Sequence, residues 1–235
     1  MNVQLQNVKA VLFDLDGTLL DSAPDLGFAA NQLRVNRGML ALPLGEYRPF
    51  VGTGARGMLR IALGVTPLDP DFEALKEEFF VAYEQCMGQH SQLFEGVSNV
   101  LQVLQKHGLQ WGIVTNKSQR FALPIVRNMH AFDRVGVVVC GDTTEHSKPH
   151  PMPLLVAAQS LGVDPAHCIY VGDDERDMLA AHGAGMQSVA AAYGYLGADG
   201  DVNAWSPHTV INSPLELLLR LGYIAHDPEL TSIFG

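Results

Sequence analysis

Short, largely apolar runs rich in β-branched residues recur along this chain, and most of them end at a polar residue or a glycine. Such runs are typical of strands that are buried on both faces of a parallel sheet. Helix-like patterns separate them, so the sequence predicts a doubly wound, Rossmann-like α/β fold with a parallel sheet. The predicted strands are residues 8–13, 109–114, 135–140, 168–171, 186–192 and 209–211. The predicted core helices are residues 97–107, 118–128, 151–161, 175–183 and 214–221.

One long interval, residues 21–90, breaks this alternation. It contains no convincing strand and shows helical patterns at 23–37, 53–63 and 71–87. About seventy residues are too many for one strand-to-helix connection, which is usually short. We therefore expect an inserted helical cap domain at 21–90 and an α/β core formed by 1–20 and 91–235.

The composition narrows the possible partners. The chain has 235 residues, of which 47% are hydrophobic, and a formal net charge of −10. This length allows a sizeable core, and the acidic charge argues against binding to nucleic acid or to an anionic membrane. No run of about 18 apolar residues predicts a membrane span, and the N-terminus lacks the features of a signal peptide. The widely spaced Cys86, Cys140 and Cys168 are expected to be buried thiols in a reducing cytoplasm.

The polar residues at the ends of the predicted strands are the candidate site, because ligands of open α/β sheets bind beyond the carboxyl ends of the strands. Two like charges as close as Asp14 and Asp16 repel each other, so a metal ion or a reaction is expected to offset the repulsion. Carboxylate oxygens suit Mg²⁺, and an ammonium and a hydroxyl suit a phosphoryl group. The groups at these ends are Asp14 and Asp16, Thr115 to Lys117, Ser147 and Lys148, and Asp173 to Asp177.

Four motifs occur in register with these strand ends: DLDGT at 14–18, Thr115, Lys148 in SKPHP, and GDDERD at 172–177. In type and order they resemble the motifs of the haloacid dehalogenase superfamily of phosphohydrolases, over essentially the whole chain. The position of the insertion is similar to the helical cap of the subgroup that includes phosphoglycolate phosphatases. The resemblance implies a Mg²⁺-dependent enzyme that hydrolyses a small anionic phosphomonoester through an aspartyl-phosphate. A monomer and a homodimer both remain open.

The resemblance also implies roles for single residues. Asp14 would be the nucleophile, and Asp16 would protonate the leaving group and then activate water. Thr115 and Lys148 would hold the phosphoryl oxygens. The remaining assignments are Gly17, Thr18 and Asn116 for substrate binding, and Asp14, Asp16 through its backbone carbonyl, Asp173 and Asp177 for the metal.

Several reactions share this set of motifs. A dehalogenase lacks the second aspartate, so Asp16 argues against that activity. A sugar-phosphate phosphomutase remains an alternative, and a non-catalytic binding protein is the least favoured one because every catalytic position is intact.

The identity of the substrate also stays open at this stage. The sequence resembles phosphoglycolate phosphatases first and N-acetylmuramic acid 6-phosphate phosphatases second. Both substrates carry a carboxylate, which Arg56 in the glycine-rich PFVGTGARGML is expected to bind, with Arg60 as second choice. No role is assigned to His146 and His150.

Overall fold

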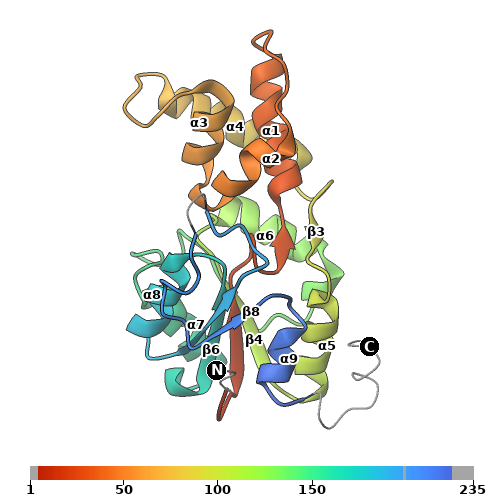
Figure 1. The fold of residues 1–235 in the computed structure, drawn as a ribbon, viewed down its shortest axis with the longest axis vertical. Helices are drawn as coiled ribbons and strands as arrows, with labels where there is room; N and C mark the ends of the chain where they lie inside the picture. The colour runs from red at the N-terminus through yellow and green to blue at the C-terminus, as the bar shows by residue number, and fades with distance from the viewer. Residues whose placement is uncertain (1–4, 198–199, 224–235) are drawn as a thin grey trace.

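The computed structural model describes residues 5–197 and 200–223. Its centre is a six-stranded parallel sheet in the order β5-β4-β1-β6-β7-β8, which confirms the predicted doubly wound sheet (Figure 1). The strands are β1 Ala10–Phe13, β4 Gln110–Val114, β5 Val137–Val139, β6 Cys168–Gly172, β7 Gln187–Ala191 and β8 Thr209–Ile211. Residues 1–4, 198–199 and 224–235, which the sequence assigns to the core, lie outside the described residues.

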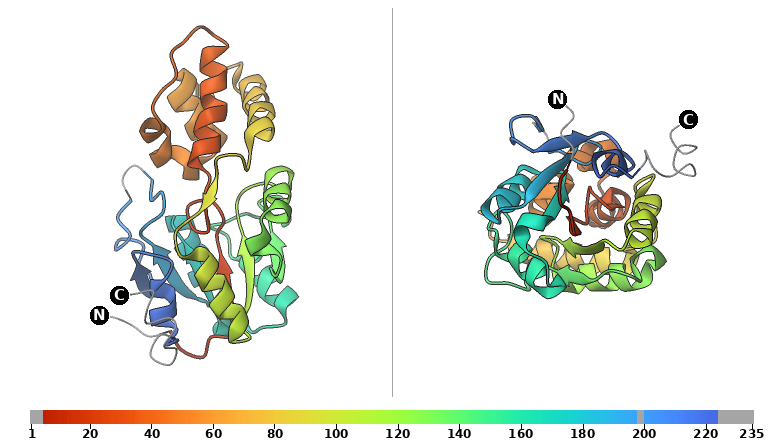
Figure 2. Two further views of the ribbon diagram at one scale, coloured as in Figure 1. Left: turned by 90° about the vertical axis from the view of Figure 1, so that its right-hand side faces the viewer. Right: turned by 90° about the horizontal axis from the view of Figure 1, so that it is seen from below.

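Helices cover both faces of this sheet, as the view from below shows (Figure 2). Successive side chains of a strand point to opposite faces. Val11 and Phe13 therefore join one apolar cluster, and Ala10 and Leu12 join the other. The first cluster includes residues of α5 Val97–Lys106, α6 Gln119–Asn128 and α9 Glu216–Arg220, and the second includes residues of α7 Met152–Leu161 and α8 Glu175–Gly183.

A group of helices with its own apolar cluster lies above one end of the sheet (Figure 1). Leu33, Met58, Leu59 and Phe79 are fully or almost fully buried there. The three helices predicted from the sequence are present, whereas the shorter α2 and the 3₁₀ helix η1 were not predicted. The elements are α1 Ala23–Val35, α2 Leu44–Tyr47, η1 Arg48–Thr53, α3 Ala55–Leu63 and α4 Phe72–Cys86. The assignment of residues 21–90 as a separate domain stays a prediction.

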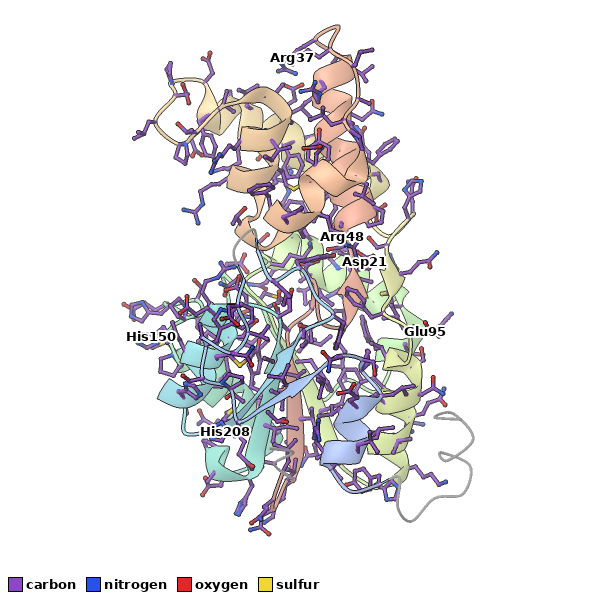
Figure 3. The ribbon with its side chains drawn as sticks, in the orientation of Figure 1. Asp21, Arg37, Arg48, Glu95, His150 and His208 are labelled. Carbon is purple, nitrogen blue, oxygen red and sulfur yellow. The ribbon has the colours of Figure 1, made fainter. Side chains whose placement is uncertain are left out.

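The chain passes between sheet and helices twice, and the two passages lie side by side. A two-residue strand, β2 Leu20–Asp21, pairs antiparallel with β3 Gln92–Leu93. The sequence analysis found no strand in this region, because two residues are too few to show a hydrophobic period. Asp21 also accepts a hydrogen bond from Arg48 at 2.9 Å, and both residues lie at this junction (Figure 3).

Two further expectations concern the cysteines and membrane-spanning helices. Cys86, Cys140 and Cys168 are buried free thiols, as predicted. None of the helices in the described ranges is both long and apolar enough to cross a bilayer.

Candidate active site

The carboxyl ends of the central strands open into a cavity of about 580 Å³ that lies between the sheet and the overlying helices. Five residues at the sheet side, which we call the floor, are Asp14, Thr115, Lys148, Asp173 and Asp177. The helix side, which we call the roof, comes from residues 51–56 together with Phe79, Phe80 and Tyr83. Asp16 lines the cavity between them. The structure therefore brings together the acids, the hydroxyl and the lysine that the sequence placed at four strand ends.

Lys148 is the most tightly held group of the floor. Its Nζ atom lies 3.0 Å from Asp14 Oδ1 and 2.8 Å from Asp177 Oδ1. The same atom lies 3.0 Å from the Val114 carbonyl oxygen and 2.7 Å from the Tyr170 hydroxyl. Burial alone would lower the pKa of Lys148, but the two carboxylates outweigh burial and raise it. The floor thus holds a fixed positive charge directly beside Asp14.

Asp14, Asp173 and Asp177 form a compact group of three carboxylates. One oxygen from each lies within 4.8 Å of the others. Burial raises the pKa of Asp14 to about 6, with Lys148 acting against burial and Asp177 adding to it. Burial, followed by the charges of Asp14 and Asp177, raises the pKa of Asp173 well above its ordinary value. Buried carboxylates that repel each other in this way fit a divalent cation, and an all-oxygen donor set suits Mg²⁺.

Two glycines leave room for Asp173. Its carboxylate accepts hydrogen bonds from the Thr18 hydroxyl at 3.1 Å and from the Tyr195 N–H at 2.8 Å. A Cβ atom at Gly17 would lie 2.1 Å from Asp173 Oδ2, and one at Gly194 would lie 2.2 Å from Asp173 Cβ. Gly17 also has a φ of +89°, which glycine adopts without steric cost. In this structure Gly17 and Thr18, predicted to bind substrate, pack against a carboxylate of the three-aspartate group.

Asp16 is held by groups that the sequence analysis did not assign. Its two carboxylate oxygens lie 3.1 and 3.0 Å from Lys117 Nζ, and the Ser22 hydroxyl donates to Oδ1 at 2.5 Å. Lys117 was recognised only as an ammonium at a strand end. It lies two residues after Thr115, and this spacing is the signal that could have placed both side chains on one side of the chain. Asp16 thereby contacts both the sheet side and the start of α1.

The predicted substrate-binding residues have different surroundings. The Asn116 side chain accepts from the Lys148 N–H at 3.0 Å and donates to the Lys148 carbonyl at 2.9 Å, so it fixes the backbone of that lysine. Arg56 is exposed and lines the roof, whereas Arg60 is exposed and does not line the cavity. Contacts of these residues with a substrate stay predictions.

Two further residues connect the site to the helices, and the sequence analysis assigned neither a role, although Arg176 lies within the GDDERD motif. Arg176 donates to both oxygens of Asp174 at 2.7 Å and to the Gly52 carbonyl of η1 at 2.6 Å. The Tyr195 hydroxyl accepts from the backbone N–H groups of Ser22 at 2.7 Å and Ala23 at 3.0 Å, where α1 begins. Since the Tyr195 N–H also binds Asp173, this residue links the acid cluster to α1.

Comparison with known proteins agrees with this geometry. A family model described as haloacid dehalogenase-like hydrolase matches residues 11–191, and the chain belongs to that family. It is 47% identical over 210 residues to a phosphoglycolate phosphatase of Xanthomonas campestris, covering 89% of this chain and 94% of that protein. It is 40% identical over 210 residues to an N-acetylmuramic acid 6-phosphate phosphatase of Pseudomonas putida, with the same two coverages.

A solved structure shows the same fold. The crystal structure of a predicted phosphoglycolate phosphatase from Haemophilus somnus superposes with a TM-score of 0.80 at 26% identity. It covers 92% of this chain and 98% of that chain. The predicted resemblance to the superfamily and the predicted fold class are therefore confirmed.

Proposed function

We propose that this protein is a Mg²⁺-dependent phosphomonoester hydrolase that forms an aspartyl-phosphate on Asp14. The observation that carries the proposal is the position of the Asp14 carboxylate, which lies 3.0 Å from Lys148 and within the cluster it forms with Asp173 and Asp177. A nucleophile that must approach an anionic phosphate needs positive charge next to it. Bound Mg²⁺, held by these three carboxylates and the Asp16 carbonyl, would supply further positive charge for the phosphoryl oxygens.

The first chemical step follows from the contacts of Asp14. Its Oδ1 atom accepts from the Leu15 N–H at 2.7 Å and lies beside Lys148. The other oxygen, Oδ2, has no hydrogen-bond donor among the described residues, so it is available to attack phosphorus. A P–O bond forms to Asp14 while the bond to the leaving-group oxygen breaks. That oxygen takes a proton from Asp16, which acquires it from solvent before the step, and Lys148 and Thr115 hold the phosphoryl oxygens.

The second step returns the enzyme to its starting state. Asp16, now a carboxylate, accepts a proton from a water molecule that attacks the phosphorus of the aspartyl-phosphate. The P–O bond to Asp14 breaks and inorganic phosphate leaves. Asp16 is suited to both steps because it lies between the floor and the roof, where the leaving group must be replaced by water.

Two substrates are supported by different observations. The first is 2-phosphoglycolate, the substrate class named for the 47% identical relative. The second is N-acetylmuramic acid 6-phosphate, named for the 40% identical relative. The cavity of about 580 Å³, with the aromatic walls Phe79, Phe80, Tyr83 and Phe121, leaves room for this larger ester as well.

The test compares 2-phosphoglycolate, N-acetylmuramic acid 6-phosphate and the uncharged-sugar ester glucose 6-phosphate, each with Mg²⁺ and with EDTA. We expect at least one carboxylate-bearing ester to have a higher kcat/KM than glucose 6-phosphate. EDTA should abolish turnover, and Mg²⁺ should restore it, whereas Ca²⁺ should be a poor substitute because it favours more ligands. Full activity in EDTA would contradict the metal assignment, and absence of hydrolysis of all three esters would contradict the substrate class.

The setting of the protein is also a proposal. Three buried free thiols, at Cys86, Cys140 and Cys168, support a reducing compartment such as the bacterial cytoplasm.

A further inference from the structure

Lys117 is a buried cation of the cavity that the proposed chemical steps do not use. Its side chain is only 8% exposed, and its Nζ atom lies 3.0 and 3.1 Å from the two oxygens of Asp16. The Lys117 side chain is thus paired with the Asp16 carboxylate inside the cavity. A second positive charge is therefore fixed next to the residue that must reach the leaving group.

The roof places a hydrogen-bond donor beside this ammonium. Lys117 Nζ lies 4.8 Å from the centre of the Tyr83 ring, and both residues line the cavity. Tyr83 is 1% exposed, and its hydroxyl forms no hydrogen bond of standard geometry among the residues that the structure describes. The nearby Lys117 ammonium acts against burial on the pKa of this hydroxyl. Burial raises the pKa of Tyr83 to about 12, so the hydroxyl keeps its proton and can donate it to an acceptor. Buried hydroxyls normally have a partner.

We propose that the Lys117 ammonium and the Tyr83 hydroxyl form a subsite for a substrate carboxylate separated from the ester oxygen by one carbon. The inference rests on the proposed phosphatase function. The leaving-group oxygen must come within hydrogen-bond reach of Asp16 for proton transfer. Because Lys117 Nζ lies 3.0 Å from Asp16, a carboxylate one carbon away from that oxygen reaches the same ammonium. Arg56, which is exposed on the roof, suits a carboxylate farther from the ester.

The subsite also connects recognition with catalysis. Without a substrate carboxylate, Asp16 is the only anion within ion-pair distance of Lys117 among the described residues. A substrate carboxylate shares this ammonium and so weakens its hold on Asp16, which can then turn toward the leaving-group oxygen. An ester without a carboxylate leaves the Lys117–Asp16 pair intact. The preference for the carboxylate therefore affects kcat as well as KM.

The experiment measures kcat and KM for 2-phosphoglycolate and for 2-hydroxyethyl phosphate, which has a hydroxymethyl group in place of the carboxylate. The quantity compared is kcat/KM for 2-phosphoglycolate divided by kcat/KM for 2-hydroxyethyl phosphate. This ratio is measured in wild type and in three variants. We expect Lys117→Met to lower this ratio about 10- to 100-fold, as for the loss of a hydrogen bond to a charged group. Tyr83→Phe, which removes only the hydroxyl, should lower it roughly 3- to 10-fold. Arg56→Ala tests the competing cation on the roof, for which the sequence predicted the same contact, and its ratio should fall less than that of Lys117→Met.

Failure of the inference and failure of the proposed function give different results. If Lys117→Met lowers kcat/KM equally for both esters, Lys117 only holds Asp16 and the inference is overturned, while the phosphatase function stands. A ratio that falls in Arg56→Ala and not in Lys117→Met overturns it as well. If wild type hydrolyses neither ester, the proposed function fails for this substrate, and the inference falls with it. Should Lys117→Met not fold, Tyr83→Phe decides, and an unchanged ratio there overturns the inference.

Discussion

The floor and the roof of the cavity present their charges in opposite ways. Lys148 on the floor is 3% exposed and lies within bonding distance of four groups. Arg56 on the roof is exposed and has no ion-pair partner among the described residues. Groups that are fixed before the substrate arrives stabilise developing charge at little reorganisation cost. In the proposed function, the floor would carry out the reaction and the roof would contact the rest of the substrate.

The backbone, like the charged groups, is more firmly held on the floor than on the roof. Asp14 and Asp173 follow or end central strands of the sheet, where neighbouring strands hold the chain on both sides. The roof segment contains Gly52 and Gly54, and Gly54 has a φ of +63°. It is joined to the sheet through the short β2–β3 pair. We expect the roof to move more readily than the floor, and such movement would exclude water from the site without changing the geometry of the floor.

The largest effect should come from the floor. Replacement of Asp14 by Asn keeps the size of the side chain and removes the nucleophile, so kcat should fall by at least about 10⁴-fold. Mass spectrometry should detect the aspartyl-phosphate in wild type and not in Asp14→Asn. The exposed Asp133→Asn is the control and should keep wild-type turnover. Turnover of Asp14→Asn within tenfold of wild type would show that the floor does not supply the nucleophile.

The second prediction concerns Asp16, which lies between the floor and the roof. With alkyl phosphates, Asp16→Asn should lower kcat roughly 10²- to 10⁴-fold, because the leaving alkoxide needs a proton. With p-nitrophenyl phosphate, whose leaving group needs no proton, the first step should proceed and aspartyl-phosphate should accumulate on Asp14. Rapid-quench measurement of the nitrophenolate burst distinguishes the two steps. If Asp16→Asn slows the first step equally for both esters, Asp16 does not act by protonating the leaving group.

Arg176 tests the attachment of the roof. Its guanidinium donates to the Gly52 carbonyl at 2.6 Å, so Arg176→Ala should release this part of the roof. We expect KM to rise about 3- to 10-fold with kcat within about twofold of wild type, as for one partly exposed charged hydrogen bond. Arg176→Lys keeps the charge but not the forked geometry, and should recover only part of the effect. A loss in kcat as large as that of Asp16→Asn would place Arg176 with the floor.

The smallest effect is a pH dependence of metal binding to the floor. The pKa of Asp14 is raised from 3.8 to about 6 by burial, so its charged form disfavours folding of the metal-free protein. This penalty is absent below the unfolded pKa, grows as the pH rises and is complete above the folded pKa. Mg²⁺ offsets it, so the gain in Tm on adding Mg²⁺ should be larger at about pH 7.5 than at about pH 5.

Thermal denaturation with Mg²⁺ and with EDTA at both pH values measures this effect. Asp173→Asn, which removes one carboxylate of the cluster, should reduce the gain at either pH. An equal gain at both pH values in wild type would contradict the assignment of these carboxylates to the metal.

The residues of the floor could be predicted because local sequence patterns mark the strands that position them. Asp14, Thr115 and Asp173 each come directly after a strand whose apolar run is visible by itself, and parallel strands bring their carboxyl ends to one edge. The order of motifs then placed Asp14, Thr115, Lys148 and Asp173 together, as the structure shows. Their predicted chemical roles still await the experiments above.

The contacts around the roof were not predictable in this way. The hydrogen bond from the Arg176 guanidinium to the Gly52 carbonyl spans 124 positions, and that from the Ser22 N–H to the Tyr195 hydroxyl spans 173 positions. Such contacts depend on how the helices lie over the sheet, which no local period encodes. The elements that were missed, α2, η1, β2 and β3, are two to six residues long and so fall below the length at which a hydrophobic period can be recognised.

Leu20 pairs with Leu93, and Asp21 pairs with Gln92. This pairing affects how the gene for such a protein can evolve. Paired strands lie about 4.8 Å apart, a gap that a two-residue hairpin turn can close. The segment of about seventy residues between Asp21 and Gln92 therefore leaves and rejoins the sheet side at neighbouring points. We predict that an in-frame exchange of this segment would alter the roof and leave the codons for Asp14, Asp16 and Asp173 untouched.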